Sequence, residues 1–309
     1  MLKCVFLFPG QGSQYVGMGK SLAEQFPSAK AVFEQADEIL GFALSQLCFD
    51  GPEDQLRLTE NTQPALVATS VAALAVLKEL GHTADFVAGH SLGEYSALVA
   101  AGSLTLADAL LLVRKRGRYM QQAVPVGAGA MAALLKLPEG KLDEVLQAAA
   151  QGEVVTAANL NSPDQIVIAG HAAAVGRAME LAKTAGAKRA ISLPVSAPFH
   201  CPLMVPAQKL LEADLNATTF ADLKIPLVNN WQARLIHTGS EARQGLYEQV
   251  PNPVRWTESI RLLIAEGAVH WIEVGPGGVL GGLLRNVDGN QKALKFGEAD
   301  DVKNLSFVG

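Results

Sequence analysis

Residues Gly89 to Gly93 read Gly-His-Ser-Leu-Gly, a pattern that could carry a catalytic serine. An apolar segment over 85–88 precedes it and a helical pattern begins near Glu94, so Ser91 would lie in a sharp turn between a strand and a helix. Glycines on both sides allow such a turn to pack closely, because a side chain would clash there. The pattern predicts that Ser91 is the nucleophile of an acyl transfer; the alternative is a glycine-rich turn with an idle serine.

A serine nucleophile needs a base, and six histidines could supply it. His200 is favoured, because Pro198 and Pro202 restrict the backbone around it and hold its side chain without the entropy cost of a loose loop. The alternative is a buried histidine in a rigid linker. His90 adjoins the serine but would point elsewhere, so we expect it to support the turn or line the pocket. The other four are typical of structural or solvated residues: His82, His171, His237 and His270.

The order of these residues differs from that of ordinary serine hydrolases. The α/β-hydrolase order is serine, then an acid, then a histidine near the end of the chain. Here His200 lies well before the C-terminus, and no acidic residue between Ser91 and His200 stands out. A backbone carbonyl or an amide could orient the imidazole instead. This departure weakens an esterase interpretation.

A densely cationic run, residues 114–118, lies in the second half of a helix predicted over Thr105 to Ala123. Such runs are usually a solvated helix face, which is our expectation for its other cations: Arg114, Lys115 and Arg118. Arg116 adjoins Gly117, and a glycine allows other groups to approach closely. A guanidinium can bind a carboxylate through two parallel hydrogen bonds, so Arg116 is a candidate for that contact.

The composition limits the class of protein. The 309 residues suffice for a large domain with a smaller insert, and 49% hydrophobic with 18% charged residues permits a sizeable core. A net charge of −5 without a long basic run argues against nucleic acid as a partner. No stretch is long and apolar enough to span a membrane. The cysteines are sparse and lack metal-ligand spacing, so we expect a cytoplasmic protein without a metal: Cys4, Cys48 and Cys201.

Strand-like and helix-like segments alternate, which predicts an α/β fold with a mostly parallel sheet. We expect a first strand over 2–8, a loop over 9–12, and a helix over 63–80 that is apolar on nearly every face, as in a buried helix. A strand at 269–274 leads into a glycine-rich turn at 275–278.

A shift to proline and glycine around residues 124–130 predicts a domain boundary. The segments after it follow the β-α-β-β-α-β order of the ferredoxin-like pattern: 131–137, 140–150, 154–159, 165–169, 172–185 and 188–193, with a turn at 161–164. We therefore expect a small ferredoxin-like subdomain at 125–196. It would be inserted in a large α/β-hydrolase-like domain formed by residues 1–124 and 197–309.

At these residues the chain resembles the malonyl-CoA:acyl carrier protein transacylases of bacterial fatty acid synthesis. The resemblance covers essentially the full length, and seven motifs in the family's order make it specific. They lie at residues 8–14, 89–94, 116–121, 159–170, 198–200, 249–256 and 273–277.

The resemblance implies a role for each site residue. Ser91 would be the nucleophile and His200 its base, with the backbone carbonyl of Gln249 orienting His200. The backbone N–H groups of Gln11 and Leu92 would form the oxyanion hole.

The substrate would be defined by two further residues. Arg116 would bind the free carboxylate of the malonyl group, and Phe199 would fill the space that an α-methyl branch needs, which favours malonyl over methylmalonyl.

The implied reaction is a ping-pong transfer of malonyl from malonyl-CoA to the phosphopantetheine thiol of acyl carrier protein, without a cofactor. Carrier proteins of this kind are acidic, so we expect a local basic patch to receive one on a monomeric enzyme. Its candidate residues are Arg114, Lys115, Lys188 and Arg189. Three alternatives stay open: a serine (thio)esterase, a non-catalytic subunit that docks carrier proteins, and a malonyl transferase acting in trans in a polyketide pathway.

Overall fold

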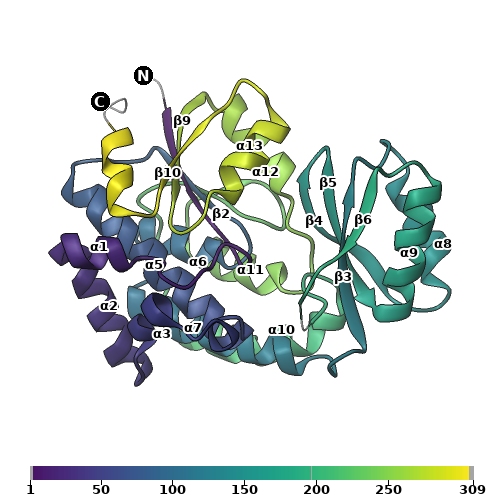
Figure 1. Ribbon diagram of the computed structural model, residues 1–309, viewed down its shortest axis with the longest axis horizontal. Helices are drawn as coiled ribbons and strands as arrows, with labels where there is room; N and C mark the ends of the chain where they lie inside the picture. Colours follow the sequence, from purple (N-terminus) through teal and green to yellow (C-terminus); the bar gives the residue numbers. More distant parts are fainter. Residues whose placement is uncertain (1–2, 196, 306–309) are drawn as a thin grey trace.

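The computed structural model describes residues 3–195 and 197–305, which form a larger α/β unit and a smaller unit beside it (Figure 1). The larger unit is built on a six-stranded sheet with the strand order β10-β9-β1-β2-β7-β8. All neighbouring strands are parallel except β7 and β8, so the predicted mostly parallel sheet is confirmed. Its strands are β1 (Lys3–Phe8), β2 (Phe86–Gly89), β7 (Leu227–Val228), β8 (Leu235–Ile236), β9 (Ala268–Val274) and β10 (Ala293–Phe296).

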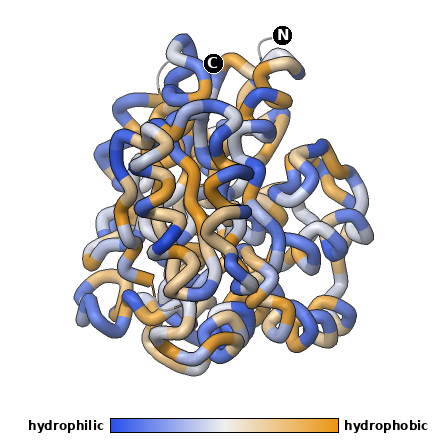
Figure 2. Tube along the Cα trace, turned by 90° about the vertical axis from the view of Figure 1, so that its right-hand side faces the viewer, coloured by the Kyte–Doolittle hydropathy of each residue, from blue (hydrophilic) through white to orange (hydrophobic). Residues whose placement is uncertain are grey.

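Side chains of β1 alternate between the two faces of this sheet and bury both of them. Cys4, Phe6 and Phe8 belong to the larger core, whereas Val5 and Leu7 belong to a second core. Figure 2 shows hydrophobic residues along the inner segments and hydrophilic residues on the outer turns.

Most helices contribute to the larger core, and α12 and α13 cover the other face of the sheet. The first group comprises α1 (Lys20–Gln25), α2 (Pro27–Leu40), α3 (Leu44–Asp50), α4 (Glu53–Leu56), α5 (Thr59–Glu79), α6 (Gly93–Ala100), α7 (Leu106–Gln122), α10 (Val205–Ala217) and α11 (Gly239–Gln249). The others are α12 (Trp256–Ala265), α13 (Val279–Val287) and the 3-10 helices η1 (Pro202–Met204) and η2 (Ala299–Asn304). In the described ranges, no helix is long and apolar enough to cross a membrane.

Helix α5 is buried on nearly every face, as predicted, but it begins four residues earlier than expected and contains Pro64. Proline has no N–H to donate to the carbonyl of Glu60. That carbonyl instead accepts a hydrogen bond from Arg114 Nη1 at 3.2 Å. Arg114 Nη1 also donates to Asn61 Oδ1 at 2.5 Å. The prediction that Arg114 is plain solvated surface was therefore wrong, because this side chain satisfies the first turn of α5.

The smaller unit contains β3 (Gly129–Leu135), α8 (Leu142–Ala150), β4 (Val155–Ser162), β5 (Gln165–His171), α9 (Ala172–Thr184) and β6 (Arg189–Ser192). The strands form a separate antiparallel sheet in the order β4-β5-β3-β6, and its two helices share a third core with it (Figure 1). The elements follow in the predicted order. The predicted turn was too long, because Asn161 and Ser162 continue β4 and residues 163–164 suffice to join the antiparallel strands.

Backbone hydrogen bonds join the two units beside β4. The N–H of Leu160 donates to the carbonyl of Val254, and the N–H of Val254 donates to the carbonyl of Ala158, both at 2.9 Å. Val254 lies just before α12, so the strand that borders the smaller sheet also contacts the larger unit. A cavity lined by residues of both units lies beside this junction.

Candidate active site

Ser91 lies in the tight turn between β2 and α6 and has a positive φ of 52°. This backbone conformation costs a non-glycine residue about 1–3 kcal/mol, so the surroundings must hold it. Both flanking glycines are sterically required. A Cβ on Gly93 would lie 2.1 Å from the carbonyl oxygen of Phe8, and one on Gly89 would lie 2.0 Å from the carbonyl of Gly93. The turn therefore packs directly against the carboxyl end of β1.

His200 reaches Ser91 from the segment that returns from the smaller unit. Its Nε2 lies 2.7 Å from Ser91 Oγ, and its Nδ1 lies 2.9 Å from the backbone carbonyl of Gln249. A carbonyl can only accept, so Nδ1 carries the proton and Nε2 is free to accept the serine proton. His200 also has a positive φ, 57°, which the sequence did not indicate. Ser196, in the same predicted rigid segment, lies outside the described residues.

Burial controls the protonation of His200. The side chain is 3% exposed, and its pKa is lowered from 6.5 to about 3, chiefly because the ring is removed from water. The nearby charge of Arg116 contributes to this shift, while the hydrogen bond to the Gln249 carbonyl opposes it. The imidazole is therefore neutral near pH 7, which is the form that a general base requires.

The rate of Ser91 acylation is expected to stay nearly constant as the pH falls from about 8 to about 5, because His200 keeps its neutral form. Single-turnover labelling by acetyl-CoA, whose acyl group carries no charge, measures it across this range; a halving of the rate near pH 6.5 would contradict the depressed pKa. Unfolded chains bind a proton on this histidine below about 6.5 and the folded protein does not. The contribution of His200 therefore lowers the free energy of unfolding as the pH falls from 6.5 toward 3.

Arg116 projects from α7 into the same site and is 2% exposed. Its Nη2 donates to Ser91 Oγ at 3.1 Å and to Gln249 Oε1 at 2.9 Å, and its Nη1 donates to Gln63 Oε1 at 2.9 Å. Every one of these partners is neutral. Within residues 3–195 and 197–305, no carboxylate lies within 4.0 Å of this guanidinium, and Nε has no hydrogen-bond partner. A buried cation with no anion in direct contact is costly, so the space beside it suits a ligand carboxylate.

The close packing of α7 against α5 explains how Arg116 meets Gln63. A Cβ on Gly117 would lie 2.7 Å from the carbonyl oxygen of Thr59, so glycine permits the approach. Gln63 was not predicted as a site residue, since the sequence placed it at the beginning of its helix.

A cavity of about 110 Å³ lies against these side chains. This is room for a few water-sized groups, which suits a short acyl group. All predicted site residues except Gln249 line it: Gln11, His90, Ser91, Leu92, Arg116, Phe199 and His200. Apolar wall is supplied by Met120, Met131, Leu193 and Val195.

His90 lines the cavity without a hydrogen bond to Ser91 Oγ in the described structure. Its Nε2 lies 2.7 Å from Asn161 Oδ1, and its ring packs edge-on against Trp256. Burial lowers its pKa. The backbone N–H groups of Gln11 and Leu92 have no acceptor among the described residues, and both residues border the cavity.

Two buried polar residues that sequence reasoning missed hold the turn. Asn230 follows β7; its Oδ1 accepts from the N–H of Ser91 and its Nδ2 donates to the carbonyl of Gly89, both at 2.7 Å. Glu94 is fully buried in the first turn of α6. Burial raises the pKa of Glu94 to about 7, and the hydrogen bonds from Gln249 and Asn230 and the charge of Arg116 oppose this shift. No local pattern in the sequence marks Asn230, because its role depends on β7 lying beside β2.

The acyl transferase domain family matches residues 5–309, so the chain belongs to this family. It is 50% identical to malonyl CoA-acyl carrier protein transacylase of Bacillus subtilis (strain 168), over 98% of this chain and 96% of the relative. An acyl carrier protein S-malonyltransferase from Vibrio cholerae superposes with a TM-score of 0.96 at 44% identity, covering 98% of this chain and 100% of that one. A malonyl-transacylase in complex with a type II PKS acyl-carrier protein has a TM-score of 0.95 at 42% identity, covering 98% of each chain. Within the family the chain thus groups with the malonyl CoA-acyl carrier protein transacylases, as the sequence motifs predicted.

Proposed function

We propose that this protein is a malonyltransferase that moves the malonyl group from malonyl-CoA to the phosphopantetheine thiol of acyl carrier protein, in fatty acid synthesis. One observation carries the substrate assignment: Arg116 is a buried guanidinium without a carboxylate partner among the described residues, and it contacts the nucleophile Oγ. In a malonyl group, a single CH₂ separates the carboxylate from the thioester carbonyl, so a cation beside Ser91 Oγ can bind the carboxylate while the serine attacks the carbonyl. The names of the relatives agree with this chemistry.

In the first step, Ser91 Oγ attacks the thioester carbonyl of malonyl-CoA while His200 Nε2 takes the hydroxyl proton. The carbonyl oxygen becomes an oxyanion, which the N–H groups of Gln11 and Leu92 stabilise. Each such donor is worth about 3–4 kcal/mol in the transition state. The C–S bond then breaks, His200 returns the proton to the departing CoA thiolate, and a malonyl ester remains on Ser91.

In the second step, the carrier-protein thiol takes the place of CoA. His200 accepts the thiol proton, sulfur attacks the ester carbonyl, and the C–O bond to Ser91 breaks. The proton returns to Ser91 Oγ, which restores the resting enzyme. These steps balance without a cofactor, and Arg116 holds the malonyl carboxylate throughout.

Intact-mass measurement of the protein incubated with a panel of acyl-CoA thioesters tests this function. Malonyl-CoA is expected to add one malonyl group, and subsequent addition of holo acyl carrier protein is expected to remove it and appear as malonyl on the carrier. No labelling by malonyl-CoA would contradict the enzyme assignment and favour a docking subunit. Rapid loss of the label to water without a carrier would favour a (thio)esterase. The polyketide alternative uses the same chemistry and predicts the same labelling. It stays open, because one structurally similar malonyl-transacylase forms a complex with a type II PKS acyl-carrier protein.

Phe199 is 9% exposed and lines the cavity beside His200, and we propose that it excludes an α-methyl branch. Replacement by alanine is expected to raise the ratio of methylmalonyl to malonyl transfer roughly 10-fold or more. The removed ring leaves room for the methyl group, and a pocket discriminates for or against one such group by about 1–3 kcal/mol. Competition between the two CoA thioesters measures the ratio. Replacement of the more distant Phe220, which does not border this cavity, serves as the control; an unchanged ratio in the Phe199 variant would exclude the role.

We also infer a docking patch for the acidic carrier. Of the four candidate cations, Arg114 is held by α5, and Lys115 Nζ lies 2.5 Å from Asp214 Oδ1. Lys188 and Arg189 are exposed at the start of β6 without an ion pair among the described residues, which makes them the favoured pair.

The finer architecture is part of the proposal. The element order and strand order of the smaller unit suit a ferredoxin-like subdomain at 125–196, and the sheet of the larger unit suits an α/β-hydrolase-like domain formed by 1–124 and 197–309. The monomeric state and cytoplasmic location stay predictions.

A further inference from the structure

Glu94 is a buried carboxylate that the proposed reaction does not use. It is 0% exposed, and its Oε2 accepts hydrogen bonds from Gln249 Nε2 at 2.8 Å and from the N–H of Asn230 at 3.1 Å. Its Oε1 has no hydrogen-bond partner among the described residues. Within that part of the chain, no cation lies within ion-pair distance of it either. A buried carboxylate in this position needs a further stabilising charge.

The side-chain amide of Gln249 connects Glu94 to such a charge, the guanidinium of Arg116. Gln249 turns its Oε1 toward Arg116 Nη2, at 2.9 Å, and its Nε2 toward Glu94 Oε2. The amide dipole is therefore aligned between the cation and the anion, with oxygen toward the positive end. The same Nε2 also donates to the carbonyl of Ser91 at 2.9 Å. Arg116 and Glu94 form one buried pair of charges that Gln249 separates.

The second partner of Glu94 supports the nucleophile. The Asn230 side chain holds the N–H of Ser91 and the carbonyl of Gly89, while its own N–H is held by Glu94. One carboxylate oxygen thus fixes both the residue that clamps the turn and the residue that orients the base.

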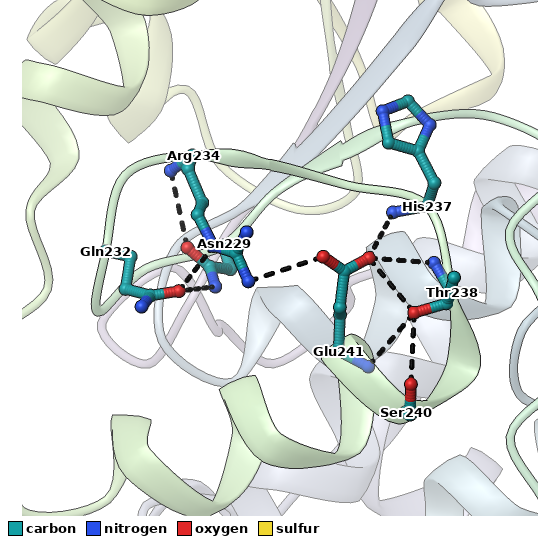
Figure 3. Close-up of polar contacts among 7 residues, drawn as sticks. All are labelled: Asn229, Gln232, Arg234, His237, Thr238, Ser240 and Glu241. Carbon is teal, nitrogen blue, oxygen red and sulfur yellow. Dashed lines mark hydrogen bonds and ion pairs between the residues drawn. The ribbon is translucent and has the colours of Figure 1, made fainter.

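A polar cluster also joins the loop after β7, which carries Asn230, to the beginning of helix α11 (Figure 3). Glu241, in the first turn of α11, accepts from the backbone of His237 and Thr238 and pairs with Arg234 at 3.3 Å. The N–H of Arg234 donates to Asn229 Oδ1. The loop that carries Asn230 is therefore tied to the beginning of α11 by this cluster, and to the end of α11, at Gln249, by Glu94. Both the loop and the helix are held at two points.

We propose that Glu94 is a positioning residue that sets the affinity of the site for acyl groups with a carboxylate, by acting as the resident counter-charge of Arg116 through the Gln249 amide. This inference rests on the proposed function. Before substrate binds, the pair of Arg116 and Glu94 has no net charge, so a malonyl carboxylate brings one unbalanced negative charge into the cluster. Glu94 therefore lowers the affinity of Arg116 for the malonyl carboxylate, so that the malonyl group can still leave the site after each transfer.

Three variants separate the charge of Glu94 from its hydrogen bonds. Glu94→Gln keeps an oxygen that can accept from Gln249 and Asn230 but removes the negative charge. Glu94→Asp keeps the charge and disturbs the hydrogen bonds. Ser96→Ala, a buried residue of the same helix whose hydroxyl has no partner among the described residues, is the matched control.

The measurement is the second-order rate of Ser91 acylation by malonyl-CoA and by acetyl-CoA, at about pH 8 so that the Glu94 carboxyl is ionised. We expect Glu94→Gln to raise the malonyl-to-acetyl ratio by about 3- to 30-fold, since only malonyl carries the charge that Glu94 repels. Glu94→Asp should lower both rates and leave the ratio unchanged, and Ser96→Ala should change neither.

A malonyl-to-acetyl ratio that Glu94→Gln leaves unchanged, whether or not both rates fall, would overturn the proposal. Glu94 would then be a purely structural residue. If Glu94→Gln does not fold, a changed ratio in Glu94→Asp would overturn it equally. Failure of the proposed function is distinguishable, because the wild-type protein would then not be labelled by malonyl-CoA at all.

Discussion

Replacement of Ser91 by alanine is expected to abolish the covalent malonyl-protein and to lower malonyl transfer by roughly 10⁴- to 10⁶-fold. Ser91 Oγ is the hydroxyl that lies 2.7 Å from an imidazole nitrogen able to accept its proton and 3.1 Å from a buried guanidinium. Intact-mass analysis after incubation with malonyl-CoA measures the label directly. Since the turn is held by backbone contacts and by Asn230, the variant is expected to fold as the wild type does.

Two companion variants make this result specific. Ser103→Ala removes another buried hydroxyl, which has no partner among the described residues, and should be labelled normally. His200→Ala should be labelled slowly, because the nucleophile remains while its base is lost. A malonyl label that persists in Ser91→Ala would place the nucleophile elsewhere in the chain.

The second large effect concerns the choice of acyl group. Arg116→Ala is expected to lower the second-order rate with malonyl-CoA by roughly 30-fold to several thousandfold, which corresponds to about 2–5 kcal/mol for the loss of one partner of a buried charge pair. Acetyl-CoA has no carboxylate for the guanidinium to bind, so its rate should be unchanged or higher. The malonyl-to-acetyl ratio therefore falls, and parallel labelling with the two thioesters measures it.

Arg118 supplies a matched control for this variant. It lies on the same helix but is 52% exposed and pairs with Glu60 at the surface, where an ion pair contributes little. Arg118→Ala should leave the ratio unchanged. Arg116→Lys tests the geometry, because lysine keeps the charge without the planar pair of donors. A malonyl-to-acetyl ratio unaffected by Arg116→Ala would remove the basis for the substrate assignment.

Local sequence patterns predicted the parts of the fold that depend on neighbouring residues. Alternating apolar segments gave the strands, and the glycines around Ser91 predicted the turn that the steric contacts require. Errors arose where a distant residue decides the outcome. Helix α5 extends over its proline because Arg114, 54 residues away from Glu60, takes up the carbonyl that proline leaves free. No window of local sequence contains that information.

The same limit applies to the site. Ser91 and His200 lie together as their residue types suggested, and Arg116 lies beside them as the resemblance to the family implied. Asn230 and Glu94 escaped notice because their roles depend on contacts 139 and 155 residues apart, across strands whose order the sequence did not give. An asparagine after a short strand is unremarkable until β7 is known to lie next to β2.

The hydrogen bonds between Val254 and β4 bear on the free energy of substrate binding. They join the backbone of the larger unit to a strand of the smaller one, and Asn159, which lies between their partners Ala158 and Leu160, lines the cavity. Because these contacts are present in the unliganded molecule, we expect little of the binding free energy to be spent on ordering this wall of the cavity. Most of the entropy lost on binding is then expected to fall on the flexible CoA or pantetheine arm.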